Sequence, residues 1–454
     1  MKSILILSIF LSAATAQAGF LDDLFSWGGN NRNRGNSGWP FSQPSDPVAP
    51  QVRENPRTPL VREGKLAPGS TTAAVWAVRN QWDDSWEKRY QEWVTNSWNV
   101  DIFTNPRSAY HGLLPDCADA VYSMRAIFAS QNGLPFAVVD PSSMRTTISN
   151  ATTKFKHFRE GPERVTAFLW WLYDVMGTTT LPNDSIPIAI NRDTVHPGGF
   201  MLAKESKHSY TIKKLRDTGV PTLYYSTQAN DGTLLVRSWP SVGFLFSAGI
   251  KGPSGIRYYR LPDDLFKPEW QVPGYSDEQY KIEANRWIRT MQATLSQRGE
   301  TAEEELKRHM DDICQLVKTR VLMVSKAYDW QQTNGDQCMD AQTYDDLSTP
   351  SRDKQMKDAF NDLAISYTRI VKEGGGLTKK LAEQMANIFA TSRTKEKGST
   401  YCSFEYMTGS SMSLGEFRRR LFSDRISSNP NEPYTVRWGS ARGPTERASS
   451  CPTY

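Results

Sequence analysis

The chain lacks a long apolar run beyond its first residues, and it is poor in cysteine and histidine. A membrane-spanning helix needs about 20 consecutive apolar residues, and nothing after the N-terminal segment approaches that length. The 454 residues include five cysteines and five histidines, and none of them follows the short spacings of zinc sites. The sequence also has no glycine-rich phosphate loop and no basic-aromatic stripe. We therefore expect no metal, no cofactor, no transmembrane segment and no nucleic-acid partner.

The first 18 residues have the pattern of a secretory signal peptide. Lys2 precedes the apolar run "ILILSIFLSAA", and Ala16, Gln17 and Ala18 form a small-residue cleavage site. The alternative is an uncleaved membrane anchor, but the run is too short to span a bilayer. We expect cleavage after Ala18 and an exported protein, either periplasmic in a bacterium or secreted.

Composition divides the rest of the chain into three parts. Residues 19–71 are rich in Gly, Asn, Ser and Pro, which predicts a disordered linker. Residues 72–270 alternate between helical periodicity and short β-like runs, which predicts an α+β domain with a mostly antiparallel sheet. Residues 271–454 favour helices and predict a separate helical domain. The formal charge of +5 is too small to identify a partner.

The expected elements follow from apolar spacing and from turn residues. Helices are predicted at 117–132, 161–176, 306–324, 352–372 and 377–391. Strands are predicted in the runs "LPFAVV", "IPIAI", "GGFMLA", "HSYTIKKL", "VPTLYYST", "LLVRSW" and "IRYYRL".

The cysteines are unevenly placed. Four lie in the last third of the chain, at Cys314, Cys338, Cys402 and Cys451. In an oxidising compartment these four form two disulfides, in any of three connectivities. Cys117 is then left alone.

Cys117 begins a predicted helix. Asp116 is a good N-cap, and Gly133 is a good residue just beyond the C-terminus. The unpaired N–H groups of a helix N-terminus favour a thiolate and lower the pKa of a thiol there. The alternative is that Cys117 is simply a small buried hydrophobe.

A thiol nucleophile needs a histidine as its base. His208 begins the strand "HSYTIKKL", where it shares one face with Tyr210 and Ile212 by the two-residue period. The alternative is a satisfied core histidine. The other histidines are expected in loops, in turns or on polar surfaces, at His111, His157, His196 and His309.

These two segments resemble a known group. "DCADAVYSMRAIF" and "HPGGFMLAKESKHSYTI" are similar to the motifs of NlpC/P60-type cysteine peptidases in the papain-like superfamily. The first segment, extended to "CADAVYSMRAIFASQNGLPFAVV", also resembles the transglutaminase-like branch. The resemblance covers about residues 95–240. It implies a helix packed on an antiparallel sheet, with Cys117 as nucleophile and His208 as general base.

The sequence departs from this family pattern at two points. Gly199 stands where the family usually has Asp. Cys117 and His208 are 91 residues apart, a longer separation than is typical, which implies an insertion around 141–190.

A third catalytic residue would orient the imidazole. A hairpin that turns at 217–219 places Gln228 opposite His208, with Ser226 and Thr227 within a one- or two-residue shift of register. The resemblance implies an orienting residue on this strand, and Gln228 is our prediction.

Three further groups are assigned around the thiol. The backbone N–H of Cys117 is the expected first oxyanion donor, and the Tyr110 hydroxyl is the candidate for the second. The alternative for Tyr110 is a buried structural role. Asp116 matches the residue that precedes the nucleophile in the family.

The resulting hypothesis is an exported thiol hydrolase that cleaves amide bonds. The resemblance implies peptidoglycan stem peptides, or another peptide of the cell envelope, as the substrate. Two alternatives stay open. One is a transglutaminase-like acyl transferase, in which an amine replaces water. The other is a non-catalytic binding or structural protein of the cell envelope that keeps the fold.

Overall fold

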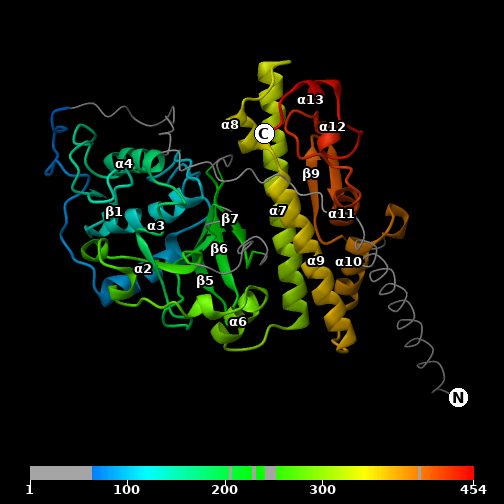
Figure 1. Cartoon of the computed structure of the whole chain (residues 1–454), viewed down its shortest axis with the longest axis horizontal. Helices are drawn as coiled ribbons and strands as arrows, with labels where there is room; N and C mark the ends of the chain where they lie inside the picture. Colours follow the sequence, from blue (N-terminus) through cyan, green and yellow to red (C-terminus); the bar gives the residue numbers. More distant parts are fainter. Residues whose placement is uncertain (1–63, 204–206, 228–231, 241–251, 397–399) are drawn as a thin grey trace.

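The computed structural model describes residues 64–203, 207–227, 232–240, 252–396 and 400–454. The expected signal peptide and most of the expected linker lie outside these residues. The described chain forms a mixed part that contains a six-stranded sheet, followed by a mainly helical part built along the long helix α7 (Figure 1).

The elements of the mixed part come first along the chain. They are α2 (Asp84–Ser97), α3 (Cys117–Asn132), β1 (Ala137–Val139), β2 (Thr147–Ser149), α4 (Pro162–Val175), β3 (Ser185–Pro187), β4 (Phe200–Ala203), β5 (His208–Leu215), β6 (Pro221–Tyr225), β7 (Leu235–Arg237), β8 (Gly255–Tyr259) and α6 (Trp287–Leu295). Short 3-10 turns lie at Pro262–Asp264, Glu269–Gln271, Glu278–Lys281 and Ala284–Arg286.

The helical part follows. It contains α7 (Ala302–Asn334), α8 (Ala341–Leu347), α9 (Pro350–Lys372), α10 (Lys379–Phe389), a 3-10 turn at Arg393–Lys395, β9 (Ser403–Met407), β10 (Ser410–Ser413), α11 (Leu414–Phe422), α12 (Tyr434–Arg437) and α13 (Glu446–Ser450).

The large sheet is antiparallel throughout, in the order β3-β8-β4-β5-β6-β7. This confirms the expected α+β class with an antiparallel sheet. The predicted hairpin between β5 and β6 is also present, and His208 pairs with Ala203 on its other side. The sheet is covered on both faces, because consecutive residues of β5, which point to opposite faces, are buried.

Helix α3 has the bounds that the sequence predicts. The Asp116 side chain accepts hydrogen bonds from the N–H groups of Ala118 and Asp119, and the Asp119 carboxylate accepts one from the N–H of Asp116, which completes a capping box. Gly133 ends the helix in the left-handed conformation at φ 61°. All residues of α3 from Cys117 to Ala129 are buried, so the helix is central to the core.

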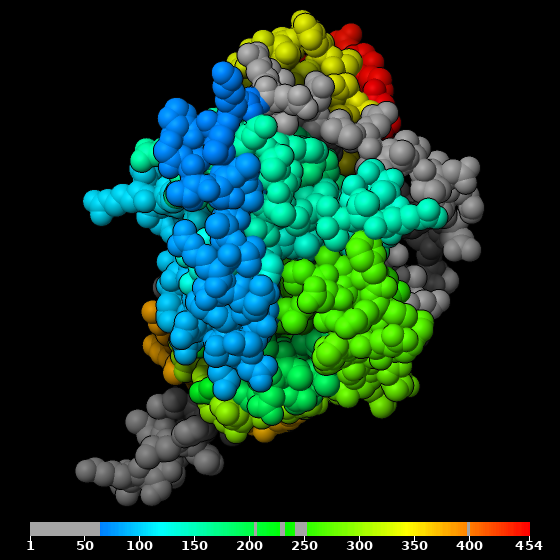
Figure 2. All heavy atoms as spheres, turned by 90° about the vertical axis from the view of Figure 1, so that its left-hand side faces the viewer, coloured from blue at the N-terminus to red at the C-terminus, as the bar shows by residue number. Residues whose placement is uncertain are grey.

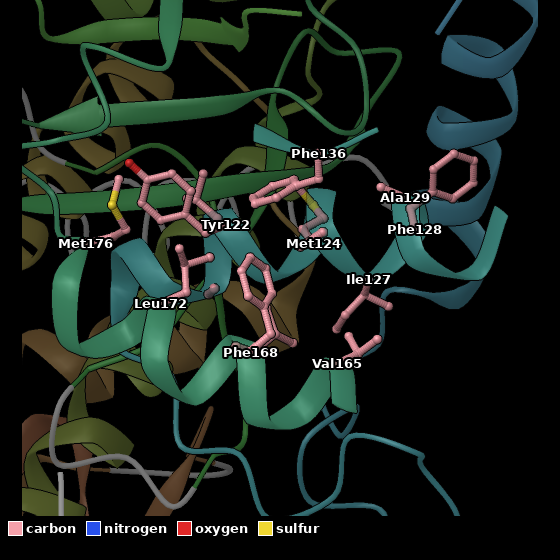
Figure 3. Close-up of a cluster of buried hydrophobic side chains, with 14 of the residues drawn as sticks. Tyr122, Met124, Ile127, Phe128, Ala129, Phe136, Val165, Phe168, Leu172 and Met176 are labelled. Carbon is pink, nitrogen blue, oxygen red and sulfur yellow. The ribbon is translucent and has the colours of Figure 1, made fainter. Parts of the chain in front are cut away.

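Helix α4 covers one side of α3. Its side chains Val165, Phe168 and Leu172 point toward α3 and meet Tyr122 and Ile127 there, as Figure 3 shows. The predicted insertion at 141–190 therefore contains β2, α4 and β3, and it contributes a large share of the core that holds the Cys117 helix in place.

The ordered chain begins earlier than residue 72. Ala67 is buried and donates its N–H to the carbonyl oxygen of Lys156 at 2.8 Å, and Ser70 accepts a hydrogen bond from buried Arg164. Residues 64–71 are thus packed on the mixed part, and the predicted linker boundary was several residues too late. The segment that starts at residue 64 lies across the face farthest from α7 (blue in Figure 2).

The predicted boundary after residue 270 was too early. Trp287, Met291 and Leu295 on α6 are fully buried in a cluster with sheet residues such as Tyr210 and Ile212. Apolar side chains at four-residue intervals form one helical face, and that face needs the sheet for its burial. Residues 271 to about 300 therefore pack with the sheet, and the helical part begins with α7.

Two disulfides stabilise the helical part. Cys314 is joined to Cys402, and Cys338 to Cys451, while Cys117 is a free thiol. The part predicted to be helical also contains one β-hairpin, which β9 and β10 form. None of the helices in the described residues is long and apolar enough to span a membrane.

The two parts are joined by buried polar contacts. Asp312 on α7 accepts hydrogen bonds from the N–H of Ser238 at 2.7 Å and from the Ser238 hydroxyl. Arg237 on β7 donates to Gln355 on α9 at 3.1 Å. The Asp312–Ser238 pair is buried and hydrogen-bonded, so it fixes the helical part against the end of the sheet.

Candidate functional site

Cys117 and His208 line the same cavity, which has a volume of about 470 Å³. Cys117 reaches it from the first turn of α3, and His208 from the first residue of β5. The cavity lies at the seam between the mixed part and the helical part, since residues of α7, α8 and α9 form its other walls.

The thiol of Cys117 lies between a hydroxyl and a carbonyl group. Its Sγ is 3.5 Å from Thr178 Oγ1 and 3.7 Å from the carbonyl oxygen of Lys207. Thr178 Oγ1 also donates to that carbonyl at 3.3 Å. Ser209 fixes the backbone at Cys117 by donating its hydroxyl to the Cys117 carbonyl at 2.9 Å.

The acidity of Cys117 is the reverse of what the sequence predicts. Burial and the nearby charge of Asp116 raise the pKa of the thiol to about 12, although hydrogen bonds from Thr178 and Ser209 oppose the shift. The helix N-terminus does not offset this rise of the thiol pKa, because Asp116 binds two of its N–H groups and places a negative charge there. In this conformation Cys117 is a neutral thiol.

His208 is neutral as well. Burial, together with the charges of Arg237 and Arg352, lowers the pKa of its imidazole to about 3. The ring lies edge-on to Tyr210 and Tyr225, with centroids 4.6 and 5.4 Å away. A neutral imidazole can accept a proton, but a pKa this low makes His208 a weak base in this conformation.

The two side chains approach the cavity from different faces of the sheet. Ser209 faces α3, as its bond to Cys117 shows, so the alternation along β5 directs His208, Tyr210 and Ile212 to the opposite face. What the thiol and the imidazole share is therefore the cavity at the start of β5, which both residues line.

The candidates for the orienting residue have different outcomes. Gln228 lies outside the described residues. A bulge between Ile212 and Lys214 shifts the register of β5 and β6 by one residue. If the pairing of Thr211 with Tyr224 is continued along the strands, the residue opposite His208 is Thr227 rather than Gln228. Thr227 lines the cavity.

Ser226 and Asp116 also line the cavity, and both have structural contacts. The Ser226 hydroxyl donates to the carbonyl of Pro115 at 2.7 Å and so holds the turn before Cys117. Asp116 caps α3. The two N–H groups that it binds belong to Ala118 and Asp119, which leaves the N–H of Cys117 outside the capping box as the oxyanion donor we expect.

Tyr110 is not brought to this site. It is buried in the core, and its hydroxyl accepts a hydrogen bond from Gln131 near the other end of α3. Fourteen residues of helix separate Gln131 from Cys117, a distance of about 21 Å at 1.5 Å per residue. The assignment of Tyr110 as an oxyanion donor was therefore wrong, and its alternative, a buried structural tyrosine, holds.

The sequence analysis missed the walls that the helical part supplies. They include Leu316 and Thr319 of α7, Asp345 and Asp346 of α8, and Arg352 and Gln355 of α9. It also missed Thr178, which lies in the turn after α4. No spacing along the chain connects these residues to Cys117, so only the tertiary arrangement could identify them.

A larger cavity, of about 930 Å³, lies between α6, α7 and α9, and no cysteine lines it. His309 faces this cavity and is half-buried, 3.3 Å from the Ser366 hydroxyl, with its pKa lowered to about 3 by burial and by Arg308. The expected polar position of His309 on the helix surface is thus only partly correct. Of these two cavities, only the smaller is lined by both a free thiol and a histidine.

Within the described residues, no group of three or more His, Cys, Asp or Glu side chains is placed to hold a metal ion. Comparison of the chain with protein-family models, with curated proteins and with solved structures gives no significant match. The family resemblance of the two motifs thus has no support beyond the residues that carry it.

Proposed function

We propose that the protein is a thiol hydrolase of the papain-like type, in which Cys117 attacks an amide carbonyl and His208 accepts the thiol proton. The observation that carries this proposal is the shared cavity, into which the first turn of α3 brings the chain's free thiol and the start of β5 brings an imidazole. The imidazolium then protonates the leaving amine, and water hydrolyses the thioester.

The substrate we propose is a peptide of the cell envelope, with peptidoglycan stem peptides as the first to test. This follows from the motif resemblance and from the expected export of the chain. The two disulfides are consistent with an oxidising compartment.

The described conformation is a resting one. Proton transfer from a thiol with a raised pKa to an imidazole with a lowered pKa is strongly unfavourable, and burial is the largest cause of both shifts. Activity therefore requires that solvent, or a charged group of the substrate, enter the cavity. The seam between the two parts is the place where this change occurs, because the cavity walls come from both.

The test is the release of peptides from isolated peptidoglycan by the exported chain, followed by mass spectrometry. We expect new amino termini with the wild type and none with Cys117→Ala or His208→Ala. Incorporation of an added primary amine in place of water would reassign the reaction to acyl transfer. Equal release by wild type and Cys117→Ala would refute thiol catalysis.

The second candidate is a non-catalytic binding or structural protein. One observation favours it: Cys117 is only 7 % exposed and its thiol is neutral, as expected of a core cysteine. This candidate requires that Cys117→Ala retain all binding to the cell envelope and that Cys117 be inert to alkylating reagents in the folded chain.

A further inference from the structure

Arg352 is the cation that the helical part contributes to the cavity lined by Cys117 and His208, called the thiol cavity below. It lies in the first turn of α9 and lines the cavity together with His208 and Tyr225. Its charge acts on the His208 imidazole, which places the guanidinium close to the proposed base.

The guanidinium has few partners of its own. Among the described residues it makes one hydrogen bond, from Nη1 to the carbonyl oxygen of Ser348 at 3.2 Å, and it forms no salt bridge. The neighbouring Arg237 donates to Gln355 from Nη1, and its Nε is buried. A guanidinium has five N–H donors in a planar fork, so most of the donor capacity of Arg352 is unused.

The other charges of the cavity do not satisfy Arg352. Asp116 is occupied by the cap of α3, and Asp346 accepts a hydrogen bond from Gln342 at 2.9 Å. Asp345 lines the cavity without forming a salt bridge to Arg352 among the described residues. Asp345, Asp346 and Asp353 act on the charge of Arg352 from nearby, and Lys207 is a second cation in the lining. Among the described residues, however, no carboxylate forms a salt bridge with Arg352, so its unused N–H donors remain for a ligand.

We propose that Arg352 binds a carboxylate of the substrate and thereby selects acyl groups that carry a free carboxyl next to the bond attacked by Cys117. This rests on the proposed function and names its substrate class. The forked donors of Arg352 match the two oxygens of a carboxylate. A bound carboxylate also neutralises one of the two charges that disfavour protonation of His208, so the substrate itself restores the strength of the base.

The test compares two alkylating reagents of similar size, iodoacetate and iodoacetamide, on the full folded chain without reductant. In both reactions the sulfur of Cys117 displaces iodide from the CH₂ carbon, and the thiol proton passes to His208 or to solvent. Each rate is divided by the rate for free cysteine in the same buffer. We expect the normalised rate with iodoacetate to exceed the normalised rate with iodoacetamide by roughly fivefold, the size expected from one half-exposed ion pair.

Three variants make the result specific. Arg352→Gln should abolish the preference, and Arg352→Lys should keep part of it, because a charge remains without the fork. Lys354→Gln is the matched control. It removes an equal charge two residues further along α9, where Lys354 is paired with Asp358 outside the thiol cavity, and it should keep the full preference.

The outcomes separate this proposal from the proposed function. A ratio that is unchanged in Arg352→Gln, while alkylation still depends on His208, overturns the role of Arg352 and leaves thiol catalysis standing. A ratio that falls equally in Lys354→Gln also overturns it, because the preference then reflects surface charge alone. If neither reagent modifies Cys117 in the folded chain, both proposals fail.

Discussion

Asp116 both caps the helix that carries Cys117 and opposes ionisation of the Cys117 thiol. Its Oδ1 accepts hydrogen bonds from the N–H groups of Ala118 and Asp119, at 2.8 and 3.0 Å. After burial, its charge is the largest cause of the raised thiol pKa. The residue that stabilises the start of α3 thus also keeps the thiol neutral in the resting state.

The first prediction concerns this pair. Asp116→Asn retains a good cap but removes the charge, so we expect the thiol pKa to fall and alkylation of Cys117 at pH 8 to speed up roughly threefold or more. Asp116→Ala is the comparison, since it loses both the cap and the charge and should lower the free energy of unfolding by about 1 kcal/mol. An alkylation rate for Asp116→Asn at or below that of the wild type would contradict this account.

The second prediction concerns Thr178, whose hydroxyl contacts the thiol and the Lys207 carbonyl. Thr178→Val keeps the shape and removes the hydroxyl, so the thiol loses a hydrogen bond that lowers its pKa. We expect slower alkylation and a free energy of unfolding lower by about 1 kcal/mol. Thr178→Ser should restore the rate. If valine and serine behave alike, the hydroxyl has no part in the site.

The third prediction concerns the pH dependence of stability. Buried Asp184 accepts hydrogen bonds from the Val139 N–H and the Tyr122 hydroxyl, both at 2.7 Å, and burial raises its pKa to about 7. The folded chain therefore holds a proton that the unfolded chain releases above its ordinary pKa of 3.8. The free energy of unfolding falls as the pH rises from about 4 to about 7, and this decline ends above the folded pKa.

Asp184→Asn tests this, because an amide can accept from Val139 and donate to Tyr122 without titrating. Urea unfolding at pH 5 and at pH 8 should give a smaller difference in the variant than in the wild type. Equal differences in the two proteins would show that Asp184 does not carry the effect.

The fourth prediction concerns the disulfides. Replacement of Cys338 and Cys451 by serine opens a loop of 113 residues and should lower the free energy of unfolding by about 2–5 kcal/mol, measured by chemical denaturation. The wild type unfolded without reductant should show one titratable thiol, which peptide mapping should assign to Cys117. A second free thiol, or a link between Cys314 and Cys338, would contradict the structure.

Local chemistry allowed much of the fold to be predicted from the sequence. The Asp116 cap and Gly133 define α3 to the residue, and apolar periodicity locates α4, α9 and the strands of the sheet. The spacing of Trp287, Met291 and Leu295 also carries a helical signal, although composition placed these residues in the wrong part of the chain. Short-range patterns do not reveal which other element an apolar helix face packs against.

The candidate site was less accessible to sequence reasoning. The two-residue period placed His208 on the face of Tyr210, but the bulge in β5 altered the register that selected Gln228. The raised pKa of Cys117 depends on burial by residues from distant segments, which no helix-start argument includes. Arg352 lies more than 200 residues beyond Cys117 and lines the same cavity only because the helical part packs against the sheet.

The most direct measurement is the rate of Cys117 alkylation by iodoacetamide from pH 5 to pH 9, for the wild type, His208→Ala and the control His196→Ala. Once the cavity opens, as the proposed activity requires, a thiol that passes its proton to a neutral imidazole should react at a rate that depends weakly on pH wherever that imidazole is deprotonated. We expect His208→Ala to lose this reactivity and to slow about tenfold for each unit by which the pH falls, as an unassisted thiol does. We expect His196→Ala to match the wild type. A wild-type profile identical to that of His208→Ala would contradict the Cys117–His208 pair and leave the non-catalytic protein as the better account.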